Sequence, residues 1–225
     1  SYSVGLTQRD NGRFRDLLMS PAYQKLWGKK FGLRKVGEER VTNDKTGWKF
    51  ASSVGGVGTG ERGDRVILDD PHNVKESESD VVRSETVRWF RESMSNRLND
   101  INKSAVVVIM QRVHEEDVSG VILSDYKDYC HLMVPMRYEP TRYPFGYNGN
   151  DIGWLDPRED DGDYAWPERF PPPALAQFER QPYMWAGQYQ QSPTPRGGGI
   201  IKEESWQLWP SENYPVCELI LGSLD

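Results

Sequence analysis

The stretch that decides the fold reads RVILDDPH, residues 65–72. An apolar run at 66–68 ends in two carboxylates, Asp69 and Asp70, and then in Pro71. A short apolar run that stops at acidic residues is typical of a buried strand in a parallel sheet. Because proline cannot continue a hydrogen-bonded ladder, the chain is expected to turn at Pro71. The stretch therefore predicts a buried parallel strand with two acids at its carboxyl end.

Strands and helices alternate on the C-terminal side of this stretch. We expect a long helix over about 76–98 and a second apolar strand over 105–110, which ends at Gln111. A short helix at about 116–123 and a third strand near 130–134 are expected to follow. Strands that alternate with helices imply parallel pairing through right-handed crossovers. The predicted fold class is α/β, a parallel sheet with flanking helices.

The N-terminal side carries two helical patterns and one extended segment. The periodicity predicts helices over 7–19 and 20–28, the second opened by proline in its first turn. Residues 47–56 look extended and lead into a glycine-rich loop.

The amino-acid composition changes after residue 136. Residues 138–175 are dense in Pro, Gly, Asp and aromatic residues, which indicates an ordered but irregular connector. A helix is possible over 174–190, and residues 193–199 are the best candidate linker. A new strand is expected over 218–224.

Composition and charge narrow the classes of protein. The 225 residues carry a net charge of −6 and are 36% apolar, and no apolar run approaches the ~18 residues of a membrane span. We therefore expect a cytosolic chain without a membrane partner. Residues 1–50 hold eleven basic and five acidic side chains, a local charge of +6, so the rest carries −12. This asymmetry permits a DNA-facing surface, although for the basic stretch alone a merely solvated face is the preferred explanation.

Paired acids at the tip of a strand suit phosphoryl transfer. On such a rigid tip, Asp69 could hold Mg²⁺ through its water shell while Asp70 polarises the attacking water. ATP would be the corresponding nucleotide. Acidic pairs at strand ends also cap helices and start turns, so the pair alone leaves both interpretations open.

Two further residues can be placed around this pair. Gln111 ends the next strand, where a polar side chain can sense a γ-phosphate, because ligand sites form at the carboxyl ends of such strands. Arg62, just before the first strand, could reach the γ-phosphate of a neighbouring subunit. The alternative for Arg62 is a loop arginine paired with Glu61 or Asp64.

A phosphate-binding glycine loop is missing from this sequence. The spacing GxxxxG occurs over residues 55–60, but Glu61 and Arg62 follow where Lys and Ser are needed. We therefore interpret these glycines as a tight loop.

Several blocks, taken together and in order, resemble the large terminase subunit of tailed bacteriophages. The blocks are SPAYQ at 20–24, RGDRVILDDP at 62–71, SETV at 84–87, WF at 89–90, QRVHEEDVSG at 111–120, WPERF at 166–170, GQYQQ at 187–191 and RGGG at 196–199. They span nearly the whole chain.

The resemblance implies a domain organisation. Residues 1–137 would be the C-terminal part of a P-loop ATPase of the additional-strand class, and 138–199 a connector. Residues 200–225 would begin a nuclease domain of RNase H-like fold. The phosphate-binding loop would then lie upstream of Ser1, and the remaining nuclease carboxylates beyond Asp225.

The resemblance also implies roles for the site residues. Asp69 would be the Walker B metal carboxylate, and Asp70 would stand in the place of the catalytic glutamate, one methylene shorter. Gln111 would belong to the motif that couples hydrolysis to movement, and Arg62 would be an arginine finger. Asp225 would be the first of several nuclease carboxylates that hold two divalent metals.

The function that follows is viral DNA packaging. ATP hydrolysis would drive double-stranded DNA into the procapsid, and the nuclease would cut concatemers. The expected partners are a small terminase subunit, the portal ring and sister copies in a homo-oligomeric ring, in the host cytoplasm. Two alternatives stay open: a non-catalytic module that docks to capsid or portal, and a helicase-like ATPase.

Overall fold

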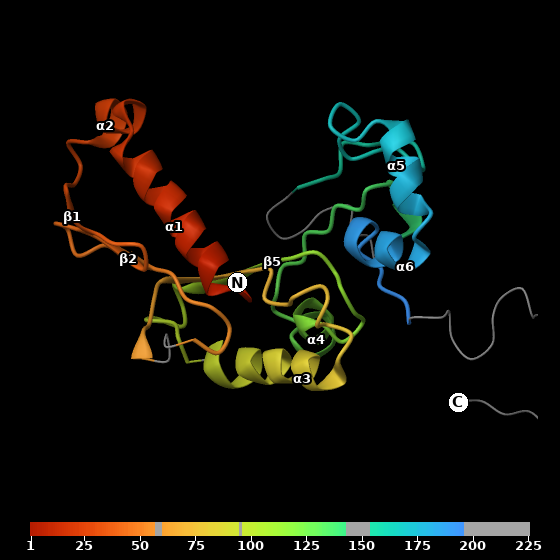
Figure 1. Ribbon diagram of the computed structural model, residues 1–225, viewed down its shortest axis with the longest axis horizontal. Helices are drawn as coiled ribbons and strands as arrows, with labels where there is room; N and C mark the ends of the chain where they lie inside the picture. Colours follow the sequence, from red (N-terminus) through yellow and green to blue (C-terminus); the bar gives the residue numbers. More distant parts are fainter. Residues whose placement is uncertain (57–59, 95, 143–153, 196–225) are drawn as a thin grey trace, which may run out of the picture. The chain divides into compact units, whose positions relative to one another are not determined.

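The computed structural model describes residues 1–56, 60–94, 96–142 and 154–195 (Figure 1), and Ser1–Thr194 belong to one unit. The strands are β1 (Leu33–Val36), β2 (Arg40–Asn43), β3 (Trp48–Phe50), β4 (Arg65–Asp69) and β5 (Ala105–Ile109). The α-helices are α1 (Val4–Met19), α2 (Pro21–Trp27), α3 (Asp80–Trp89), α4 (Val118–Asp125), α5 (Pro172–Glu179) and α6 (Pro182–Met184). Three shorter turns are the π-helical η2 (Phe90–Met94) and η4 (Trp185–Tyr189) and the 3-10 helix η3 (Pro140–Arg142). The unit is therefore mixed α/β.

The predicted parallel pair is present. β4 and β5 run parallel and in register, from Arg65 opposite Ala105 to Asp69 opposite Ile109. The helix α3 with η2 lies between the two strands in the chain, as a parallel connection requires. Both predictions, the strand after Arg62 and its parallel partner, are confirmed.

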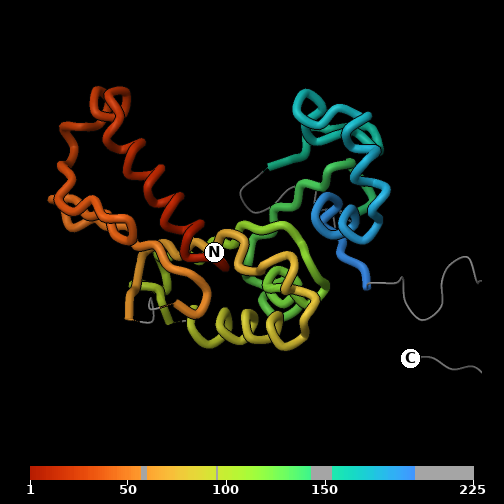
Figure 2. Tube along the Cα trace, in the orientation of Figure 1, coloured from red at the N-terminus to blue at the C-terminus, as the bar shows by residue number. Residues whose placement is uncertain are grey.

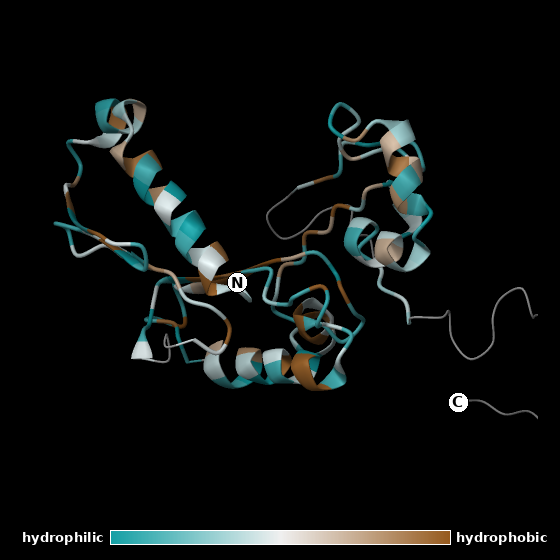
Figure 3. Cartoon of the chain, in the orientation of Figure 1, coloured by the Kyte–Doolittle hydropathy of each residue, from teal (hydrophilic) through white to brown (hydrophobic). Residues whose placement is uncertain are grey.

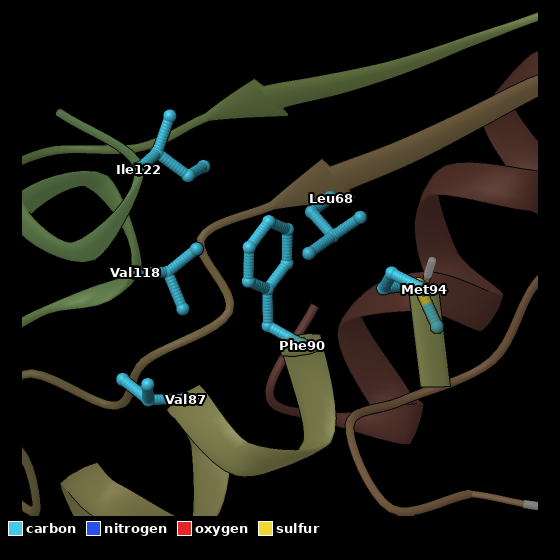
Figure 4. Packing of buried hydrophobic residues seen from close by; sticks show 6 residues of the cluster. All are labelled: Leu68, Val87, Phe90, Met94, Val118 and Ile122. Carbon is cyan, nitrogen blue, oxygen red and sulfur yellow. The ribbon is translucent and has the colours of Figure 1, made fainter. Parts of the chain in front are cut away.

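One face of this pair carries the hydrophobic core. Leu68 of β4 packs with Val87, Phe90 and Met94 from α3 and η2 and with α4 residues (Figure 4). The Phe90 ring points at the strand and lies between Leu68 and the α4 side chains in the same view. Figure 3 shows the apolar colouring of β5 and α4 that makes this packing possible.

The opposite face of the pair is open in the described part of the chain. Ile67, Val107 and Ile109 point away from α3 and α4 and stay 60%, 39% and 56% exposed. Successive side chains of a strand alternate between faces, so an apolar run buries only half of its residues when one face is covered. The predicted burial of this strand is therefore met on one face only: Leu68 is buried, whereas Ile67 on the other face is exposed within the described part of the chain.

The N-terminal region contains both predicted helices. α1 covers the predicted segment, and Ser20 caps α2 by accepting a hydrogen bond from the Tyr23 amide (3.3 Å). The chain returns from α2 through an antiparallel sheet in the order β1-β2-β3 (Figure 2). Only the last strand of this sheet falls within a predicted extended segment, 47–56.

Three predicted elements differ in the structure. Residues 130–134 form no strand, because this extended segment has no ladder partner among the described residues and runs into the buried Pro135. The long helix begins only at Asp80, where Ser79 caps it, and continues as η2 to Met94. The expected helix over 174–190 is broken into α5, α6 and η4 at Pro182, which has no N–H to continue a helical ladder.

Some expectations lie outside the described residues. These are the strand over 218–224, the nuclease residue Asp225 and most of the linker 193–199. Within the described ranges, no helix has the length and apolar character needed to cross a bilayer.

Candidate functional site

The two acids lie where the parallel pair ends. Asp69 is the last residue of β4 and is exposed, and the Asp70 amide continues the ladder by donating to the Ile109 carbonyl (2.9 Å). Asp70 has a left-handed backbone (φ 42°), which Asp adopts more readily than most residues. Pro71 is fully buried and ends the strand. The chain therefore turns sharply while the acids remain on a fixed strand tip.

Gln111 meets this tip. Its backbone amide donates to Asp70 Oδ1 at 3.3 Å, across the carboxyl ends of the two strands. Burial raises the pKa of Asp70 above its ordinary value, the Gln111 amide opposes that shift, and the neighbouring Asp69 charge adds to it. The predicted proximity of the acids and Gln111 is thus present at the level of the Gln111 backbone.

The acids have acceptor capacity left over. In the described part of the chain the Asp69 carboxylate accepts no hydrogen bond, and Asp70 accepts one through Oδ1. Mg²⁺ is commonly held by one or two carboxylates together with waters and phosphate oxygens, so this pair fits that ion. No group of three or more His, Cys, Asp or Glu residues suited to a metal occurs among the described residues. A site that holds a metal by protein ligands alone is therefore not formed there.

Two cavities adjoin the turn that follows the acids. The larger, about 470 Å³, is lined by His72, Glu85 and Trp89 among others. The smaller, about 170 Å³, lies between β4 and η2 and includes Arg62 in its lining. Pro71 lines both, whereas Asp69, Asp70 and Gln111 line neither. The acids consequently lie beside these hollows, on the strand tip.

Arg62 is not brought to the acids. Arg62 precedes β4 whereas Asp69 ends it, and the four steps along this five-residue strand separate its ends by roughly 13 Å. Neither carboxylate expected as its partner is bound to it: Glu61 pairs with Arg40, and Asp64 accepts from Asn99 (3.0 Å). Within the described residues Arg62 can therefore act only at a distance from this strand tip, as a finger toward another subunit would.

Asp117 is a key residue that sequence reasoning passed over. Its carboxylate is fully buried and accepts hydrogen bonds from Arg112 Nε (2.9 and 3.0 Å) and from the backbone amides of Val113, His114 and Gly120. It is the N-cap of α4 and orders the loop that follows β5. The signal for it is an Asp directly before an apolar run.

Gly120 belongs to the same arrangement. A Cβ atom added there would lie 1.8 Å from the Glu115 carbonyl oxygen, so only glycine fits. The block QRVHEEDVSG, which carries part of the resemblance, thus combines a residue at the strand tip with residues that build a tight helix cap.

His72 supplies a second cap for α4. Its Nε2 accepts a hydrogen bond from the Val118 amide (3.0 Å), which requires a neutral ring with the proton on Nδ1. Burial lowers the pKa of His72 from about 6.5 to about 4, against the opposing effect of Asp117. His72 is thereby a structural residue that ties the turn after the acids to α4.

The chain matches no protein-family model and no curated protein sequence.

Proposed function

We propose that this chain is part of a DNA-packaging terminase large subunit, in which the Asp69–Asp70 strand tip serves ATP hydrolysis. The sequence resemblance and one structural observation support it. Two carboxylates with free acceptor atoms lie at the carboxyl end of a parallel strand, beside Gln111, which follows the end of the neighbouring strand β5 by two residues. This is the edge at which α/β sheets bind ligands.

The residues divide the chemistry between them. Asp69, exposed at the tip, would hold Mg²⁺, which neutralises phosphate charge when bound. Asp70, held by the Gln111 amide, would orient the attacking water. Gln111 would sense the terminal phosphate through its side chain, and Arg62 would serve a neighbouring copy in a homo-oligomeric ring. In this proposal β4 and β5 belong to the sheet of a P-loop ATPase.

The affinity for Mg²⁺–ATP tests the nucleotide half of the proposal. In the full-length protein, which in this proposal carries the phosphate-binding loop, Asp69→Asn removes one charged ligand without changing side-chain size, so the affinity measured by calorimetry should fall at least about tenfold. Asp64→Asn is the matched control, because it removes the same charge just before the other end of β4. Equal affinities of the two variants would refute the site. We expect no efficient ATP turnover or DNA cleavage by the 225-residue chain itself.

A basic surface supports double-stranded DNA as the partner. Residues 21–50 contain eight basic and three acidic side chains, +5 within a chain of −6. Two of the basic residues are engaged: Arg40 pairs with Glu61 and Lys49 lies over the Phe14 ring (4.4 Å). The other six are exposed and form no ion pair among the described residues: Lys25, Lys29, Lys30, Arg34, Lys35 and Lys45. A polyanion is the partner that this local charge complements.

The salt dependence of duplex binding tests this half without metal or nucleotide. Each phosphate that the protein no longer neutralises should reduce the slope of log affinity against log salt by about 0.9. The triple variant Lys29→Gln, Lys30→Gln, Lys45→Gln should therefore reduce the slope by roughly 2.7. The control replaces three exposed lysines outside this surface, Lys75, Lys103 and Lys127, by glutamine. The same slope in both variants would show that residues 21–50 do not contact the duplex.

A further inference from the structure

The loop after β5 is held almost entirely by side chains. Four successive amides, from residue 111 to residue 114, donate to side-chain oxygens: Gln111 to Asp70, Arg112 to Gln191 Oε1 (3.2 Å), and the next two to Asp117. The loop has no helix or strand of its own at these positions. Its geometry is therefore set by residues from β4, α4 and the segment after η4.

Gln191 is the most distant of these partners in sequence. Its Nε2 donates to the Gln188 carbonyl (2.7 Å), which orients Oε1 toward the Arg112 amide. Its backbone is left-handed (φ 55°), an unfavourable conformation for a residue other than glycine. The carbonyl of Gln191 accepts from Arg142 Nη2 (3.2 Å). A strained residue held by three contacts is a fixed point for the loop that it binds.

Two further contacts clamp the same loop. A Cβ atom at Gly187 would lie 2.9 Å from the Arg112 carbonyl oxygen, so the two backbones approach as closely as only glycine allows. The Tyr183 hydroxyl donates to the Val113 carbonyl (3.5 Å). The block GQYQQ, which the acid-pair chemistry does not use, therefore lies directly against the loop that begins at Gln111.

We infer that Gln191 is a positioning residue for the acid-pair site: it fixes the Arg112 amide and, through the adjoining peptide, the Gln111 amide that binds Asp70. The inference rests on the proposed function in one respect, namely the role in ATP hydrolysis that the proposal assigns to the acid pair. The geometric claim concerns this loop alone. Gln191 touches neither carboxylate and acts through Arg112.

Amide hydrogen exchange measured by NMR on the intact chain tests this positioning. Gln191→Ala should speed exchange of the Arg112 and Gln111 amides by roughly fivefold or more, the factor for one net hydrogen bond. The strand amides of β4 and β5 should keep their protection. Gln191→Glu retains an acceptor oxygen for the Arg112 amide but loses the Nε2 bond to the Gln188 carbonyl, so it should restore slow exchange at both amides only in part.

Gln188→Ala is the matched control, because the Gln188 side chain makes no hydrogen bond within the described residues. It should leave the Gln111 amide unchanged. The inference fails if Gln191→Ala speeds exchange only at Arg112, or equally at every strand amide, since the second result would mean general destabilisation. The experiment uses neither metal nor nucleotide, so it can succeed where the ATP-binding test fails, and the reverse.

Discussion

Two carboxylate sites contact the loop after β5 and differ in how many of their acceptor atoms the protein uses. We call the Asp117 site the satisfied corner and the Asp69–Asp70 site the open corner. Asp117 is fully buried and its two oxygens accept from Arg112 and three backbone amides. Asp69 and Asp70 lie on a strand tip, and one hydrogen bond from Gln111 is what the described residues supply to them. The protein itself fills the hydrogen-bond acceptors of Asp117, whereas Asp69 and Asp70 retain acceptor atoms that a ligand could use.

The difference separates structural acids from candidate functional ones. A buried carboxylate with every acceptor used cannot take a ligand without losing its own bonds. At the strand tip, the exposed Asp69 carboxylate has no such bonds to give up when a cation and a phosphate arrive, and the Asp70 carboxylate has one. The sequence alone does not make this distinction, because Asp117 and the acid pair are both aspartates that lie next to a short apolar run.

The largest expected effect is the loss of the satisfied corner. Asp117→Ala leaves Arg112 without its carboxylate partner and three backbone amides without their acceptor. The free energy of unfolding should therefore fall by about 3–5 kcal/mol. Urea denaturation measures this change. Asp125→Ala is the control on the same helix, since its pair with Arg91 is exposed and contributes little to stability. Similar losses in the two variants would remove the contrast between the corners.

The next effect is a pH dependence that arises beside the satisfied corner. The folded protein holds His72 neutral, with a pKa lowered to about 4, while the unfolded chain takes up a proton near 6.5. The contribution of neutral His72 to the free energy of unfolding is therefore fully present above pH 6.5. It decreases as the pH falls toward 4, by about 3 kcal/mol in total.

The variant His72→Gln isolates this contribution. It offers an amide oxygen to Val118 and does not titrate, so its unfolding free energy should vary less between pH 7 and pH 4 than that of the original chain. Burial also lowers the pKa of His131, but that residue is present in both proteins. Identical pH profiles would contradict the assignment of His72 as a neutral cap.

The smallest effect concerns the open corner. Because burial raises the pKa of Asp70, ionising it costs stability: the loss begins as the pH passes the ordinary Asp pKa and is complete above the raised one. Asp70→Asn removes the charge, keeps an acceptor for Gln111 and tolerates the left-handed backbone. The melting temperature at pH 7 should rise slightly, and this rise should disappear at low pH. A fall in melting temperature would indicate that the charge itself holds the fold.

The parallel pair and the two N-terminal helices could be predicted from the sequence because their signals are local. Apolar runs ending in acids, and Ser20-Pro21 before a helical pattern, depend on near neighbours. The antiparallel sheet was largely missed because β1 and β2 are short and mostly polar, although the turn Asn43–Gly47 between β2 and β3 carried a usable signal. The segment 130–134 is as apolar as a short strand but lacks a ladder partner among the described residues, which no local pattern reveals.

The candidate site was predictable in part for the same reason. Asp69, Asp70 and Gln111 end consecutive strands, so parallel pairing alone brings them to one edge. The roles of Asp117, His72 and Gln191 depend on contacts across 5, 46 and 79 residues of sequence. The last two follow from tertiary packing, and single-sequence periodicity carries no information about them.

The most direct test of the open corner is site-resolved line broadening by Mn²⁺, a paramagnetic substitute for Mg²⁺, in amide NMR spectra of the chain. We predict that the Asp69, Asp70 and Gln111 amides broaden first, that the Gly120 amide at Asp117 broadens later, and that Asp69→Asn abolishes the early effect. Early broadening at Gly120, or broadening that is even over the acidic surface and unchanged in Asp69→Asn, would contradict the assignment of this strand tip as the metal site.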